Sequence, residues 1–91
     1  MDIIRKHMKI FGSVQGVGFR YRASHSASMY GVAGWVRNDE DGSVEMEVQG
    51  TQEQINSMLD LIKKGHYIQI DNIIEKTLPL KDDDNGFSIR D

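Results

Sequence analysis

Residues 12–20 read GSVQGVGFR, a glycine-rich bend between a strand-like pattern and a helix-like pattern. Glycines let the backbone turn so that successive N–H groups point inward, and a helix start adds unpaired N–H donors. The helix macrodipole contributes roughly half a positive charge at that end. Arg20 adds a permanent cation whose planar fork fits two oxygens of one phosphate. The stretch therefore predicts a phosphate pocket at a strand-to-helix junction.

The segments on either side of this bend are ordered strand and helix. Period-2 alternation predicts a first strand over residues 8–13, before and into the bend. Apolar positions on one helical face predict a helix from Phe19 to Tyr30, ended by Gly31. A second strand is expected over residues 32–38, followed by a turn at Glu40-Asp41-Gly42. The third strand, from residue 44 to Gly50, alternates most clearly.

The second half of the chain predicts a capped helix and two more strands. Thr51 and Gln54 have the spacing of a capping box, and apolar residues at i, i+3, i+4 and i+7 begin at Ile55. Gly65 ends this helix. An isoleucine-rich strand is expected over residues 68–78, then an acidic exposed loop over 81–86, which includes Asp82-Asp83-Asp84, and a short strand over 87–90.

The order β-α-β-β-α-β is that of a ferredoxin-like sandwich in the α+β class. We expect a mostly antiparallel sheet, a short extra C-terminal strand and both helices on one face. Residues 1–91 are expected to form a single domain, with residues 1–6 as a short extension ahead of it. Phe19 and Trp35 are expected in the core, together with Met8, Met46 and Met58.

Composition narrows the class of protein. The absence of cysteine excludes disulfide scaffolds, thiolate zinc sites and a cysteine nucleophile. The longest apolar runs are far short of the roughly 20 residues of a membrane span, and the N-terminus lacks the apolar stretch of a secretion signal. With a net charge of −3, nothing global attracts nucleic acid or anionic lipid. We expect a cytoplasmic monomer that binds neither nucleic acid nor membrane.

The bend does not have the spacing of a nucleotide-binding loop. A Walker A site needs four residues between its glycines and then Gly-Lys-Ser/Thr, whereas here Gly16-Val17-Gly18 runs directly into Phe19 and Arg20. A dinucleotide fingerprint needs a third glycine, and Tyr21 stands in its place. Both nucleotide readings are therefore poor.

A second segment, GWVRNDEDGSVEMEVQG at residues 34–50, makes the prediction specific. Together the two segments closely resemble the signatures of the acylphosphatase family. The first signature is an aliphatic residue, any residue, then Gly-x-Val-Gln-Gly-Val-x-Phe-Arg, which residues 10–20 match throughout. The second is Gly-aromatic-Val-basic-Asn, three residues, Gly-x-Val, five residues and Gly, which residues 34–50 match.

This resemblance implies hydrolysis of the carboxyl–phosphate bond of acyl phosphates, without a metal or another cofactor. It implies that Arg20 holds the phosphate and that the carboxamide of Asn38 positions the attacking water. The backbone N–H groups implied to share in phosphate binding are those of Gln15, Gly16, Val17, Gly18 and Phe19. The substrate is expected to be a small acyl phosphate or an acyl-phosphorylated protein.

Other readings of these residues stay open at this point. Asn38, before an acidic turn, fits a plain turn residue. Arg37 is expected on the other side of the strand from Asn38. Glu45 and Glu47 need no acid–base role, and the histidines lack metal-ligand spacing. The alternative function is a non-catalytic ferredoxin-like module that binds phosphate, carbamoyl phosphate or RNA.

Overall fold

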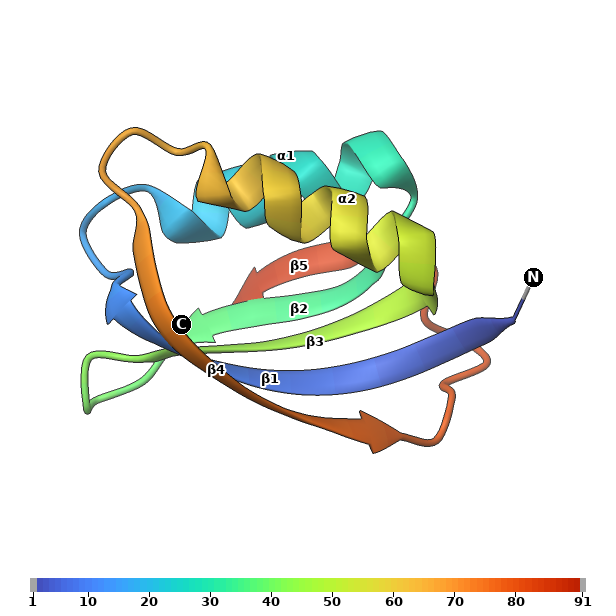
Figure 1. The fold of residues 1–91 in the computed structure, drawn as a ribbon. Helices are drawn as coiled ribbons and strands as arrows, with labels where there is room; N and C mark the ends of the chain where they lie inside the picture. The colour runs from blue at the N-terminus through green and yellow to red at the C-terminus, as the bar shows by residue number, and fades with distance from the viewer. Residues whose placement is uncertain (1, 91) are drawn as a thin grey trace.

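The computed structural model describes residues 2–90 and has the predicted element order (Figure 1). The elements are β1 (Ile3–Ser13), α1 (Phe19–Tyr30), β2 (Ala33–Asn38), β3 (Val44–Thr51), α2 (Gln52–Lys63), β4 (Gln69–Leu78) and β5 (Phe87–Arg90). The bounds predicted for α1 and β5 are confirmed. The capping box of α2 is also confirmed, with Thr51 accepting from the Gln54 N–H and the Gln54 side chain accepting from the Thr51 N–H.

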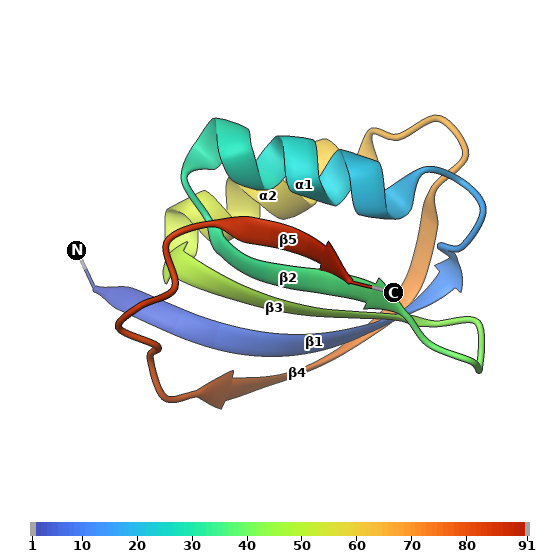
Figure 2. The same ribbon diagram turned by 180° about the vertical axis from the view of Figure 1, so that it is seen from behind.

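The sheet has the strand order β4-β1-β3-β2-β5, and both helices cover one of its faces (Figures 1 and 2). All neighbouring strands are antiparallel except β2 and β5, which are parallel. The predicted ferredoxin-like sandwich with a short extra strand is therefore confirmed. Within residues 2–90, neither helix is long and apolar enough to cross a membrane.

The core lies between the helices and the sheet. Every second residue of β3 faces the helices, which is the alternation that the sequence predicts. Phe19 of α1 and the predicted methionines pack in this layer as expected. The fully buried residues of α2 that meet them are Ile55, Met58 and Ile62. This shared core fixes the start of α1 against the end of β2, which is where the two motifs meet.

β1 begins earlier than its sequence pattern predicts. Residues 3–6, which we expected to precede the domain, pair with β3, from Ile3 opposite Thr51 to Lys6 opposite Val48. Residue 1 of that expected extension lies outside the described residues. Arg5 is only 1% exposed and donates from Nε to Glu47 and from Nη1 to Asp84, at 2.8 Å each. Two acidic partners thus allow a charged residue to lie inside β1.

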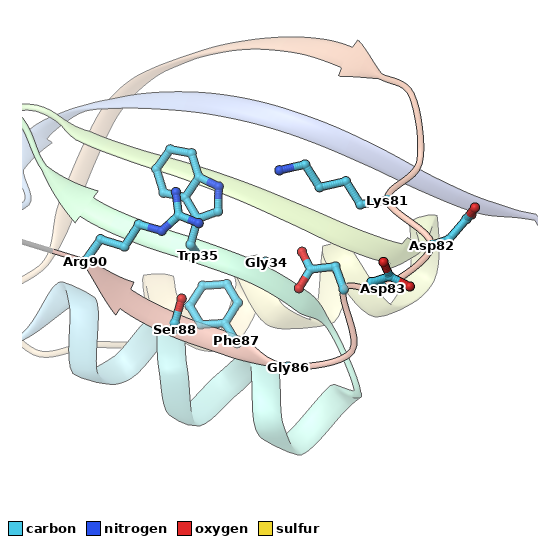
Figure 3. A pocket seen from close by; sticks show the side chains of 10 residues that line it. Gly34, Trp35, Lys81, Asp82, Asp83, Gly86, Phe87, Ser88 and Arg90 are labelled. Carbon is cyan, nitrogen blue, oxygen red and sulfur yellow. The ribbon is translucent and has the colours of Figure 1, made fainter.

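Side chains cover part of the face of the sheet that lies away from the helices. Trp35 is buried, as expected, but it lies on this face and outside the core between sheet and helices. Its ring centroid is 4.6 Å from the Arg90 guanidinium carbon (Figure 3). The guanidinium carbon of Arg37 lies 5.4 Å from the same centroid. Asp84, expected in a solvated loop, instead pairs with Arg5 and helps tie residues 81–86 to the sheet.

Candidate active site

A small cavity at one end of the sandwich brings the two motifs together. Its volume is about 160 Å³, and its lining residues, here called the phosphate pocket, are Val14, Gly16, Gly18, Phe19, Arg20, Tyr21 and Asn38. The β1–α1 loop and the β2–β3 turn lie at this same end (Figures 1 and 2). A water occupies about 30 Å³ in the liquid, so the cavity has room for a phosphate group and one water. The pocket therefore joins both halves of the predicted site.

The loop over residues 14–18 is shaped by left-handed glycines. Gly16 has φ 71° and Gly18, at the N-cap of α1, has φ 81°, conformations that cost other L-residues roughly 1–2 kcal/mol each. Across residues 2–90, no N–H from residues 15–19 donates to another protein group. Alternating left-handed residues form a concave set of N–H donors, and the positive end of α1 adds to it. This arrangement suits an anion.

Gln15 has a structural role that its sequence motif does not reveal. Its Nε2 donates to the carbonyl oxygens of Asp39 and Ser43, at 2.6 and 2.9 Å. These two residues close the β2–β3 turn, where the Asp39 N–H also donates to the Ser43 carbonyl. The Gln15 side chain thus joins the phosphate loop to the strand end that holds Asn38. Val17 lies outside the lining of the phosphate pocket, in a neighbouring groove.

Asn38 is the last residue of β2 and lines the phosphate pocket. Its Oδ1 is buried and accepts no hydrogen bond from the residues that the structure describes. Leaving a buried acceptor unpaired costs about 1–3 kcal/mol, so such a group usually has a ligand or water as partner. This position and this unmet hydrogen bond distinguish Asn38 from an ordinary turn residue.

Arg20 lies in the first turn of α1, where its side chain also reaches the end of β5. Its Nη1 is 3.5 Å from the Arg90 carbonyl oxygen, a long contact. The permanent charge of Arg20 thus stands at the wall of the pocket, next to the N-terminus of α1. A guanidinium and a set of backbone donors together supply the positive surroundings that a phosphate dianion needs.

The β2–β3 turn beside Asn38 is held by charged groups. Asp41 accepts hydrogen bonds from the hydroxyl and the N–H of Ser43, and these lower the pKa of its carboxyl to about 2. Lys9 Nζ lies 3.1 Å from Asp41 and 3.7 Å from Asp39, and its hydrogen bond to Asp41 raises the pKa of Lys9. An ionised Asp41 therefore helps to hold the turn.

Arg37 points to the other face of the sheet, as expected. Its Nη2 donates to Glu45 at 2.7 Å, and its Nε lies 3.4 Å from Asp39 Oδ1. Glu45 is thus held in an ion pair with Arg37. On that face a larger cavity of about 710 Å³ lies beside β2 and β5, with Lys81 and Trp35 among its lining residues (Figure 3). Asp82, Asp83 and Asp84 also line it.

Comparisons with known proteins show the family of the chain. The chain matches the sequence model of the acylphosphatase family over residues 6–89. It belongs to the acylphosphatase family. It is 40% identical over 83 residues to the acylphosphatase of Clostridium acetobutylicum, covering 90% of this chain and 91% of that protein. It is 36% identical over 91 residues to that of Bifidobacterium longum, covering 98% and 94%.

Comparison with solved structures finds the same fold in other proteins. The crystal structure of acylphosphatase from Bacillus subtilis superposes with a TM-score of 0.85 at 31% identity, over 96% of this chain and 98% of that one. The structure of T. kodakarensis HypF matches with a TM-score of 0.82 at 29% identity, over 97% of this chain but only 12% of HypF. The same acylphosphatase-like fold is thus found as a small protein and within a larger one.

Family membership confirms the predicted enzyme class, a hydrolase that acts on acyl phosphates. Both segments in which we find acylphosphatase signatures lie inside the matched range, and they meet at the phosphate pocket. Among residues 2–90, no group of three or more histidine, cysteine, aspartate or glutamate side chains is placed to hold a metal ion.

Proposed function

We propose that the phosphate pocket is the active site, in which Arg20 and the backbone N–H groups of residues 15–19 bind the phosphate and Asn38 orients water. The observation that supports this most strongly is that Arg20 and Asn38, 18 positions apart in the sequence, line one cavity. Gly16, Gly18 and Phe19, whose N–H groups donate to no other group among residues 2–90, line the same cavity. The donor set and the water-holding group therefore have one place to act together.

The proposed reaction breaks the bond between phosphorus and the acyl oxygen. Water oxygen attacks phosphorus opposite the leaving carboxylate, and the products are the carboxylate and inorganic phosphate. Phosphoryl transfer passes through a loose transition state, so positioning and charge balance supply most of the catalysis. A carboxylate leaves without help from a strong acid. The water proton passes to a phosphate oxygen of the substrate, because Asn38 is neutral and is not a base.

The carboxamide of Asn38 suits this task better than a carboxylate. Its oxygen accepts one hydrogen of the water, which directs the lone pairs of the water oxygen toward phosphorus. A carboxylate at the same position would repel the phosphate dianion across a cavity of about 160 Å³. An acceptor such as Asn38 Oδ1 also repels phosphate oxygens unless a donor lies between them. A water molecule is such a donor.

This last point favours hydrolysis over the alternative, a module that binds phosphate or carbamoyl phosphate without reaction. A pocket that only binds a phosphate gains from donors and loses from an unpaired acceptor in its wall. Asn38 Oδ1 is such an acceptor. RNA binding is a weaker alternative still, because the net charge is −3 and would oppose a polyanion.

We extend the proposal to the setting of the enzyme. Both helices and the sheet share one core, so residues 1–91 are proposed to act as a single domain. We also propose that the enzyme acts as a monomer on a small acyl phosphate or on an acyl-phosphorylated protein. The absence of cysteine fits the reducing cytoplasm, where we expect the protein to work.

A substrate panel tests the proposal. The purified protein is incubated with acetyl phosphate and carbamoyl phosphate, and with phosphate monoesters as controls, in the presence of EDTA. We expect inorganic phosphate to be released from the acyl phosphates and not from the monoesters, whose alkoxide leaving groups need an acid. Equal hydrolysis of monoesters, or loss of activity in EDTA, contradicts the proposed mechanism.

A further inference from the structure

The large cavity on the helix-free face of the sheet is built from three segments. Its volume is about 710 Å³, and its lining residues come from β2, β5 and the β4–β5 connection (Figure 3). Sites for small organic ligands have volumes of roughly 300–1,000 Å³. This cavity shares no lining residue with the phosphate pocket. It is therefore a separate place with room for a small organic molecule.

Trp35 brings an unpaired hydrogen-bond donor to this cavity. The residue is only 7% exposed, yet its indole Nε1–H donates to no group among residues 2–90. Figure 3 shows the indole nitrogen on the side of the ring that faces Lys81, across the cavity. A polar group in so buried a residue usually has a partner, and an indole N–H can only donate. The missing partner is therefore a hydrogen-bond acceptor.

Two cationic side chains reach the same part of the cavity. The guanidinium of Arg90 lies over the Trp35 ring, with its carbon 4.6 Å from the ring centroid. An arginine that lies over an aromatic ring keeps its N–H donors available for an oxyanion. Lys81 extends toward Trp35 from the opposite side (Figure 3). Within the described residues 2–90, neither of these cations forms an ion pair. Three donors thus converge on one region.

The acidic residues of the β4–β5 connection limit the charge of a partner. Asp84 is already paired with the buried Arg5 at 2.8 Å. Asp82 and Asp83 are exposed and lie at the end of the cavity away from Trp35 (Figure 3). Their charges weaken the attraction for an anion, and they do so more for a dianion than for a monoanion. A carboxylate, with one charge and two acceptor oxygens, therefore fits these donors better than a phosphate does.

We propose that Trp35, Lys81 and Arg90 form a binding site for the carboxylate of a small organic acid. Trp35 Nε1–H and the Arg90 guanidinium donate to the carboxylate oxygens, and Lys81 Nζ adds a second positive charge. The apolar part of the acid lies along Gly34 and Gly86, which have no side chains to exclude it. The site does not depend on the role proposed for the phosphate pocket.

The chain has a single tryptophan, so the indole N–H of Trp35 gives a direct test. Its NMR signal is followed while phenylacetate is added, with phenylacetamide, the uncharged analogue, and inorganic phosphate as comparisons. We expect phenylacetate to move the signal downfield in a saturable way, because a hydrogen bond to a carboxylate is charge-assisted. Phenylacetamide and phosphate should bind at least about 10-fold more weakly.

Variants locate the binding. Lys81→Ala and Arg90→Ala should each raise the Kd for phenylacetate about 3- to 10-fold, and both side chains are exposed, so folding should not be disturbed. Lys63→Ala is the matched control, because Lys63 is an exposed lysine of α2 that does not line this cavity. Arg20→Ala should also leave the Kd unchanged, because Arg20 lines the phosphate pocket instead.

Each contrary result overturns a stated part of the proposal. An indole signal that does not move, or that moves equally with phenylacetamide, overturns the site. An equal rise in Kd for Lys63→Ala and Lys81→Ala overturns it as well. Binding of phosphate as tight as that of phenylacetate overturns the preference for carboxylates. A rise in Kd for Arg20→Ala that matches the rise for Lys81→Ala overturns the separation from the phosphate pocket.

Discussion

Arg20 combines two properties that phosphate binding requires. Its guanidinium is a permanent charge, and its donors match two oxygens of one phosphate. Its place in the first turn of α1 adds the positive end of that helix. The side chain therefore contributes to binding through charge and through geometry. Substitutions can separate these two contributions.

We predict that Arg20→Ala lowers the affinity for inorganic phosphate at least about 100-fold, since each charge-assisted hydrogen bond contributes roughly 1.5–3 kcal/mol. Arg20→Lys keeps the charge but loses the fork, so a smaller loss of about 10-fold is expected. Isothermal titration with phosphate in EDTA measures both. Affinity of Arg20→Ala within threefold of wild type would show that Arg20 does not hold the phosphate.

At the scale of elements, the β2–β3 turn connects the two halves of the pocket. It follows Asn38 directly, and its carbonyl groups at Asp39 and Ser43 accept the Gln15 side chain. Asp41 in turn holds Ser43. We therefore expect a substitution at Asp41 to alter the turn that positions both Gln15 and Asn38.

This turn should be sensitive to acid. Because the folded pKa of Asp41, about 2, lies below its ordinary value, ionised Asp41 stabilises the folded turn. That contribution is complete above about pH 4 and is lost as the pH falls toward 2. We predict that the difference in unfolding free energy between wild type and Asp41→Asn shrinks as the pH is lowered from 5 to 2. Urea unfolding across that range measures it, and a difference independent of pH contradicts the assignment.

At the scale of the whole molecule, Arg5 connects the N-terminal part of β1 to the chain that follows β4. Its guanidinium is buried between Glu47 of β3 and Asp84 of the β4–β5 connection. Gln49 supports the same connection by exchanging hydrogen bonds with the backbone of Lys81, at 2.9 and 3.0 Å. Segments that are remote in sequence are thus joined on the helix-free face.

We predict that Arg5→Ala lowers the unfolding free energy by about 3 kcal/mol, because removing one partner of a buried ion pair leaves the other charges uncompensated. The matched control is Lys6→Ala. Lys6 pairs with the exposed Glu75 at 2.9 Å, a contact worth about 0–1 kcal/mol. Urea denaturation of both variants measures the contrast. Equal losses would mean that Arg5 is not a buried anchor.

Much of this fold could be predicted from the sequence because apolar periodicity and caps are local signals. The Val44 alternation and the Thr51–Gln54 capping box each lie within one element, and both predict what the structure contains. The helix-free face could not be predicted in this way. The sequence places Arg5 in an extension ahead of the domain and Asp84 in an exposed loop, because their pairing joins positions 79 residues apart.

The candidate site likewise has a part that could be predicted from the sequence and a part that could not. Arg20 and Asn38 lie in recognisable motifs, and their shared cavity follows from the fold. The hydrogen bonds of Gln15 to the β2–β3 turn could not be predicted, because the acceptors are backbone carbonyls with no side-chain signature. The groove that Tyr21 and Tyr67 line could not be predicted either, because the two residues lie far apart along the chain.

The central claim is that the two motif segments have different roles in the phosphate pocket. Arg20 and the loop bind the phosphate, and Asn38 directs the water. The most direct measurement is the effect of Asn38→Ala on kcat for acetyl phosphate and on the Kd for inorganic phosphate. We predict that kcat falls about 100-fold or more while Kd stays within threefold, because only the orientation of water is lost. A variant that loses phosphate affinity but keeps kcat would contradict the account.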